Sequence, residues 1–365
     1  MFLCGVDVRK ITRLSTSKCC LVYQRCVAFF WIVYILHVIA SYKIGDNSSE
    51  QTVKEILARK IPDVIAFLIW LILWNKQRKI SVLLNDIHCL QLAFKMKFHF
   101  LWAQLGTIIV IAVPSIAWLT MTQPFVEEGC RLLVKYYTLD LFDLSRVQNC
   151  NILYFIMAWN QFTIYTLRTC VVVLYIIICC LMRNVLNAHS ENGSQKISNN
   201  SSSSDYICLN QYFTTYDNII ECLKSLEKLM SFPIFLIQIS ECFSIFYGFV
   251  IKDYDIRKSW MKSFSIGIAY DSILSLISFL CVSFAASSIH EASKNAKEVQ
   301  EKMLKRILTS RQQRNNQELL RLFITRTSPP FTLSAFGFFH FTRGMILSAV
   351  GSVLTYSLLI IQVLK

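Results

Sequence analysis

Long runs of apolar residues divide this sequence and constrain its fold more than any other feature. Most runs reach the roughly 20 apolar residues that a helix needs to cross a bilayer. Soluble domains place charges at about 25% of positions, whereas this chain of 365 residues has 16% charged and 54% hydrophobic residues. We therefore predict an all-α membrane protein with seven transmembrane helices. Their apolar blocks are residues 23–41, 62–74, 99–119, 152–181, 231–251, 265–287 and 344–364.

Two of these blocks depart from the ideal length. The second has a short apolar core, so we expect its helix to begin upstream within residues 52–60 and to contain Pro62. The fourth is longer than a bilayer requires, which predicts a helix that is tilted or that projects beyond the membrane. The first block lacks a small-residue cleavage site at its end, so we interpret it as a membrane helix rather than a signal peptide.

The basic residues between the blocks predict an orientation. If residues 1–22 are cytoplasmic, the cytoplasmic segments, counted together with Arg25 at the start of the first block, hold 24 Lys and Arg residues, and the outer segments hold 12. The excess favours a cytoplasmic N-terminus and an extracellular C-terminus, which is opposite to the orientation of a G-protein-coupled receptor. Because the basic residues lie beside membrane blocks, the net charge of +14 indicates contact with lipid headgroups rather than with nucleic acid.

Several charged segments on the predicted cytoplasmic side have patterns of their own. Residues 189–205 are rich in Ser and Asn and are predicted to form a flexible loop. Residues 209–229 and 294–323 place apolar side chains at helical spacing among charges. This pattern favours helices that extend below the bilayer and pack together, with solvated basic loops as the alternative.

The last block has one face of small and polar residues and one face of branched apolar residues. At 100° per residue, the first face suits either close packing between helices or the wall of a water-filled pore. The pattern alone leaves both interpretations open. The small and polar face contains Gly344, Ser348, Gly351, Ser352, Thr355, Leu359 and Gln362.

The end of this block resembles a known family signature. Thr355-Tyr356, five apolar-leaning residues and Gln362 are similar to the Thr-Tyr-(five hydrophobic)-Gln-Phe ending of insect gustatory receptors, with Val363 where Phe is usual. Residues 337–339, Gly-Phe-Phe, also resemble that family's approach to its last helix. On these residues the chain is identified as a member of the superfamily of seven-helix gustatory and odorant receptors.

The resemblance implies a ligand-gated, non-selective cation channel of the plasma membrane, placed in sensory-neuron dendrites. It implies a tetramer, either of identical subunits or with other gustatory receptor subunits. Residues 23–287 would hold six helices and the ligand pocket, residues 288–343 a cytoplasmic anchor, and residues 344–365 the pore helix. The side chains predicted to face the pore are Ser348, Gly351, Ser352, Thr355, Leu359 and Gln362.

The implied ligand is a small-molecule tastant. Sugar receptors of the family commonly have Glu after the Thr-Tyr pair, whereas this chain has Ser357, so a bitter-type compound is favoured. An odorant receptor of the same superfamily is the closest alternative, and a G-protein-coupled receptor is a more distant one. We predict no enzyme activity, because the chain has no Gly-rich phosphate loop and no His-Glu-x-x-His motif. No cofactor and no metal site are predicted either.

Three ionisable residues lie inside the apolar blocks, where such residues are functional candidates by default. Arg168 and Glu241 lie at similar depth in adjacent blocks, which predicts an ion pair that serves either structure or ligand contact. Asp271 lies nearer the outer end of its block, where we expect the pocket. Aromatic and amide side chains there suit an alkaloid-like molecule, with an interfacial aromatic belt as the alternative. The predicted pocket residues are Trp118, Trp159, Asn160, Gln161, Tyr247, Tyr270 and Asp271.

Overall fold

The first six predicted blocks all form helices in the computed structural model of the protein. The structure describes residues 18–45, 53–96, 100–121, 151–198, 205–254, 262–309, 329–348, 351–352 and 355. The helices are α1 (Lys18–Gly45), α2 (Val53–Ala93), α3 (Phe100–Met121), α5 (Asn151–Ser198), α6 (Asp205–Tyr254) and α7 (Lys262–Thr309). The last helix begins at residue 343 and is described at residues 343–348, 351–352 and 355.

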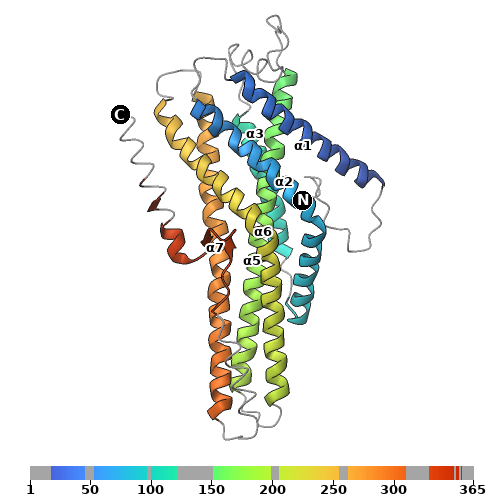
Figure 1. Ribbon diagram of the computed structural model, residues 1–365, viewed down its shortest axis with the longest axis vertical. Coiled ribbons are helices and arrows are strands. Elements are labelled where there is room, and N and C mark those ends of the chain that lie inside the picture. The colour runs from blue at the N-terminus through green and yellow to red at the C-terminus, as the bar shows by residue number, and fades with distance from the viewer. Residues whose placement is uncertain are drawn as a thin grey trace, which may run out of the picture.

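The central bundle is formed by α5, α6 and α7, which lie side by side along the long axis of the molecule (Figure 1). These helices contain 48, 50 and 48 residues. At 1.5 Å per residue each is about 70 Å long, about twice the thickness of the bilayer core. Each is therefore long enough to cross the membrane and to extend well beyond its hydrocarbon core.

The predicted amphipathic segments form these extensions. Residues 209–229 lie within α6, and residues 294–309 form the end of α7, while residues 310–323 lie outside the described part of the chain. Phe213, Leu223 and Leu226 are fully buried on α6, and Val299 and Met303 are buried on α7. The helical spacing thus correctly predicted two helices that pack together, and the alternative of solvated loops is wrong for the described residues.

The prediction of a flexible loop at residues 189–205 is wrong for its first ten residues. α5 continues without a break to Ser198, and only residues 199–204 lie outside the described chain. His189 is buried and stacks on Tyr212 of α6, with ring centroids 3.9 Å apart. A Cβ atom at Gly193 would lie 2.8 Å from Val299 of α7. Packing between helices therefore overrides the low helix propensity of this Ser- and Asn-rich segment.

Apolar length varies among the described helices. Four contain segments long and apolar enough to cross a membrane: Val22–Ala40, Gln161–Gln195, Gln211–Phe246 and Ile266–Lys305. The apolar stretch of α3, Gln104–Thr120, is shorter. α2 begins at Val53 and contains Pro62, as predicted from its short apolar core.

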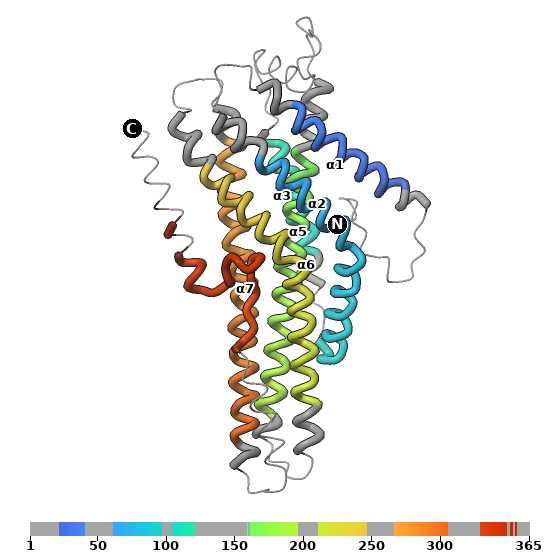
Figure 2. The backbone as a smooth tube through the Cα atoms, in the orientation of Figure 1, coloured from blue at the N-terminus to red at the C-terminus, as the bar shows by residue number. Residues whose placement is uncertain are grey.

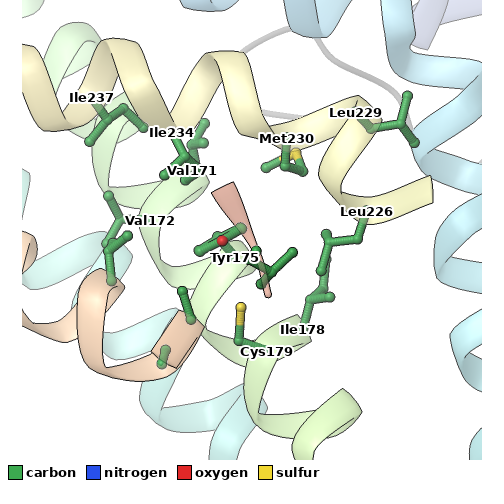
Figure 3. Packing of buried hydrophobic residues seen from close by; sticks show 14 of the residues in the cluster. Val171, Val172, Tyr175, Ile178, Cys179, Leu226, Leu229, Met230, Ile234 and Ile237 are labelled. Atoms are coloured by element: carbon green, nitrogen blue, oxygen red, sulfur yellow. The ribbon is translucent and has the colours of Figure 1, made fainter. Parts of the chain in front are cut away.

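The core between α5 and α6 consists of apolar side chains from facing turns (Figure 3). Val171, Tyr175 and Ile178 of α5 meet Leu226 and Ile234 of α6, and all five are buried. α1 joins the bundle through α2, where Trp31 and Trp70 stack with ring centroids 5.8 Å apart.

A small β-hairpin connects the bundle to the last helix, and the sequence analysis did not predict it. Its strands, β1 (Ser334–Ala335) and β2 (Phe339–His340), pair antiparallel. Phe336 and Gly337 adopt positive φ angles of 52° and 76° in the turn, which is uncommon for a bulky residue such as Phe. The Phe336 ring lies 4.6 Å from the Phe232 ring of α6, so the turn is held against the bundle (Figure 2).

Candidate functional site

A polar network centred on Arg168 joins the three central helices. The Arg168 guanidinium of α5 lies 3.7 Å from Glu241 of α6 and 3.6 Å from Asp271 of α7. It also donates a hydrogen bond of 2.7 Å to Ser275 of α7. The structure thus brings together the predicted pair, Arg168 and Glu241, and adds Asp271 to it. We call Arg168, Glu241, Asp271, Ser275 and Tyr165 the Arg168 layer.

The two carboxylates of the Arg168 layer have different surroundings. Glu241 is 0% exposed and accepts hydrogen bonds from Ser278 and, at 3.0 Å, from the Gln238 amide. Asp271 is 20% exposed and accepts a hydrogen bond of 2.9 Å from the Tyr165 hydroxyl. Glu241 is therefore enclosed by donors, whereas Asp271 lies partly open near the start of α7.

Four polar members of this network were missed by the sequence analysis. Each lies three, four or seven residues from an ionisable residue of its own helix. These spacings place both side chains on the same helix face. Such spacing around an intramembrane charge was the signal that could have identified them. The four residues are Tyr165, Gln238, Ser275 and Ser278.

The other predicted pocket residues lie at varied positions. Tyr270 is half-buried, and its hydroxyl donates a hydrogen bond of 3.2 Å to the Val113 carbonyl of α3. Gln161 is also partly buried. Trp118 and Trp159 are exposed, which agrees with the alternative of an interfacial aromatic belt. The side chains of Asn160 and Tyr247 lie outside the described part of the structure.

The start of the last helix exposes its small and polar face. Ser348, Gly351, Ser352 and Thr355 are exposed, and the Thr355 hydroxyl donates a hydrogen bond of 2.8 Å to the Gly351 carbonyl of its own helix. Such internal bonding satisfies the hydroxyl without a partner helix. Leu359 and Gln362 lie outside the described residues.

The hairpin segment is fastened to α6 and α7 by polar contacts. Glu227 of α6 accepts hydrogen bonds from the backbone N–H of Ser334 at 3.1 Å and from its hydroxyl at 2.5 Å. The Phe331 N–H donates to the Ser293 hydroxyl of α7 at 2.9 Å, and Arg343 forms an ion pair with Glu291 of α7. These contacts therefore link the start of the last helix to α6 and α7, the two helices that carry the carboxylates of the Arg168 layer.

A cavity of about 380 Å³ lies between α2 and α6 in the extended part of the bundle. Its lining includes two carboxylates, Asp86 and Glu221, and two thiols, Cys89 and Cys222. None of the predicted pocket residues lines it. Within the described ranges, no group of three or more His, Cys, Asp or Glu side chains could hold a metal ion.

Comparisons with known proteins agree with this architecture. A family model described as "7tm Chemosensory receptor" matches residues 2–363, nearly the whole chain. The structure of the insect olfactory receptor OR5 from Machilis hrabei is similar, with a TM-score of 0.70 at 12% identity, over 99% of this chain and 97% of that chain.

The structure of the same receptor in complex with eugenol is also similar, with a TM-score of 0.71 at 13% identity and the same coverage. A comparison with curated protein sequences gives no significant match. The prediction of an all-α membrane protein with seven helices is confirmed by the family model and by the shared fold.

Proposed function

This chain belongs to the 7tm chemosensory receptor family, and from this premise we propose that it is a gustatory-type receptor, a subunit of a ligand-gated, non-selective cation channel. The family is one of chemosensory receptors and not of enzymes. The observation that carries the gustatory assignment is the Thr355-Tyr356 pair followed, after five residues, by Gln362 near the end of the last apolar block. The proposed ligand is a bitter-type tastant, since Ser357 replaces the Glu common in sugar receptors.

The proposed pore is formed by the last helix from each subunit of a tetramer. Its small and polar face, with Ser348, Gly351, Ser352 and Thr355, supports this role because these residues are exposed in the single chain. Hydroxyls and the amide of Gln362 would provide hydrogen-bonding groups for hydrated cations without a fixed charge. Leu359 completes the proposed pore-facing set. Membrane lipid would surround the other helices.

The proposed ligand pocket lies among α3, α5, α6 and α7, on the side of the Arg168 layer where α7 begins. The hydrogen bond from Tyr270 to α3 and the contacts of Asp271 with α5 support a site where three helices converge. Trp118, Trp159, Asn160, Gln161 and Tyr247 complete the predicted set. The pairing of Arg168 with Glu241 would form the floor of this pocket rather than bind the ligand, since Glu241 is fully enclosed.

An odorant receptor is the second candidate function. The specific observation in its favour is the shared fold with the olfactory receptor OR5, which was solved in complex with eugenol. Both candidates use the same proposed channel. A panel of water-soluble bitter compounds tested beside volatile odorants would separate them, because a gustatory receptor should respond to the first class and an odorant receptor to the second.

The channel function is tested by recording cation currents from cells that express the full chain, alone and with other gustatory receptor subunits. Gln362→Ala should change conductance or ion selectivity. Ile360→Ala is the matched control, because helical spacing predicts that Ile360 faces away from Gln362, on the apolar face of the last block. Ligand-gated currents whose conductance and selectivity are the same in Gln362→Ala and the unmodified protein would contradict the pore assignment.

A further inference from the structure

The Arg168 layer contains one basic and two acidic side chains. One guanidinium, Arg168, faces two carboxylates, Glu241 and Asp271, and no other ion pair to either carboxylate occurs among the described residues. With all three groups ionised the layer has a net charge of −1. A net charge buried between membrane helices is costly unless a partner of opposite charge offsets it. The layer therefore favours the arrival of a further cation.

The surplus charge belongs to Asp271 rather than to Glu241. Glu241 is enclosed and receives hydrogen bonds from Ser278 and Gln238 in addition to the Arg168 ion pair. Asp271 is the more exposed carboxylate, and both of its contacts use the same oxygen, Oδ1. Its other oxygen, Oδ2, has no partner among the described residues. Asp271 thus keeps a lone pair available for an N–H donor.

A second acceptor in the same network also lacks a donor. The Gln238 side chain is 2% exposed, and its amide nitrogen donates to Glu241. Its amide oxygen is buried and has no hydrogen-bond partner. Buried acceptors without donors are uncommon because each loses its hydration without replacement. The surplus carboxylate calls for a ligand that carries positive charge. The unpaired Gln238 oxygen is a separate observation, and it shows that the network can accept one more hydrogen-bond donor.

We propose that the ligands of this receptor are protonated amines and that Asp271 is their counter-ion. The proposal rests on the proposed function and names the ligand class of its pocket. The ammonium group would bind at Oδ2 of Asp271, while Arg168 stays with Glu241 and Ser275. The phenol of Tyr165, already bonded to Asp271, and the adjacent Tyr270 provide aromatic surface of the kind that favours cations. With neutral molecules of the same shape, only the Arg168 guanidinium, which Asp271 shares with Glu241, would offset the charge of Asp271.

The first test uses the unmodified full-length protein, purified in detergent, and measures its thermal unfolding with ligand pairs that differ only in charge. The pairs are tryptamine with tryptophol and phenethylamine with phenethyl alcohol. A ligand that binds the folded state raises the unfolding temperature. We expect at least one of the two amines to raise the unfolding temperature in a concentration-dependent manner. Each alcohol should bind at least about tenfold more weakly than its amine. Equal shifts within both pairs, or no shift with either amine, would overturn the proposal.

The second test assigns the effect to Asp271. Asp271→Asn should weaken amine binding about tenfold or more while leaving the alcohols unchanged, and Asp271→Glu should retain part of the amine preference because it keeps the carboxylate. Asp86→Asn, a carboxylate of the α2–α6 cavity, is the matched control and should bind amines as the unmodified protein does. The proposal would be overturned if folded Asp271→Asn preferred amines to alcohols as strongly as the unmodified protein does. It would also be overturned if Asp86→Asn lost as much amine binding as Asp271→Asn.

Current recordings separate this proposal from the channel function. Ligand-gated currents evoked by neutral compounds such as eugenol, with no preference for amines, would overturn the amine proposal and leave the channel function standing. Amine binding that requires Asp271 in a protein that passes no ligand-gated current with any subunit combination would support the amine site and contradict the channel function.

Discussion

Different types of interaction hold the same three helices together at two levels of the bundle. In the Arg168 layer, α5, α6 and α7 each contribute a charged residue, and these meet through ion pairs and hydrogen bonds. Farther along lies what we call the His189 layer, which consists of His189 and Gly193 of α5, Tyr212 and Tyr216 of α6, and Ser293 and Val299 of α7. Its helices meet through ring stacking and close van der Waals contacts, and the hydroxyl contact between Tyr216 and Ser293 is long, at 3.4 Å.

The difference follows from the surroundings of each layer. Inside the bilayer the lipid tails are as apolar as the side chains, so apolar burial provides little drive for helices to associate, and polar contacts contribute more. We predict that the His189 layer lies beyond the bilayer, where water surrounds the helices and burial of rings and methyl groups provides the main drive. On this prediction, one continuous set of helices uses polar contacts in the membrane and apolar packing outside it.

The largest effect is expected from removal of the charge at the centre of the Arg168 layer. Arg168→Leu would leave Glu241 and Asp271 without their cation, and a buried charge stripped of its partner destabilises a protein by about 3–5 kcal/mol. Thermal or denaturant unfolding of the purified protein measures this. Arg183→Leu, at an exposed position of the same helix, is the control. If both variants lose the same stability, the Arg168 layer does not hold the helices by charge.

A matched pair of Tyr→Phe variants compares the two layers directly. Tyr165→Phe removes a 2.9 Å hydrogen bond to a carboxylate and should cost about 1.5–3 kcal/mol, since hydrogen bonds to charged groups are the stronger ones. Tyr216→Phe removes a 3.4 Å contact between two hydroxyls and should cost about 0.5 kcal/mol or less. Unfolding free energies of both variants check this order. A larger loss in Tyr216→Phe would show that polar contacts also dominate the His189 layer.

The smallest effect on stability is expected from a change in close packing at Gly193 in the His189 layer. At Gly193 a Cβ atom would contact the buried Tyr212 hydroxyl and lie 2.8 Å from both Tyr212 Cζ and Val299 Cγ1. Alanine normally stabilises a helix interior by about 1 kcal/mol relative to glycine. Because the stacked Tyr212 ring cannot move aside, we expect Gly193→Ala instead to lower the free energy of unfolding by about 1 kcal/mol.

Gly344→Ala is the control for that experiment, because nothing lies within 4 Å of a Cβ atom at Gly344. It should leave the stability unchanged or raise it slightly. The double variant Gly193→Ala with Tyr212→Phe should recover part of the loss, since the hydroxyl closest to the new methyl group is removed. A Gly193→Ala variant more stable than the unmodified protein would contradict close packing in the His189 layer.

Part of the candidate site was predictable from the sequence because an ionisable residue in an apolar block stands out by itself. Arg168, Glu241 and Asp271 were identified this way, and the contact between Arg168 and Glu241 followed from their similar depth. Asp271 was expected to face the pocket alone. Its contact with Arg168 was not predictable, because the rotation of each helix about its axis depends on the packing of its neighbours. The orientation in the membrane stays a prediction.

The sequence by itself determined features that depend on residues close together in the chain: the apolar blocks, the helical spacing that lengthens α6 and α7, and the family ending at Thr355-Tyr356 and Gln362. Only the tertiary structure decided features that depend on contacts between distant segments. Residues 189–198 stay helical because His189 and Gly193 pack closely against Tyr212 and Val299. The hairpin turn at Phe336 is held because the Phe232 ring packs against the Phe336 ring. In both places the packing energy exceeds the local conformational preference of the residues.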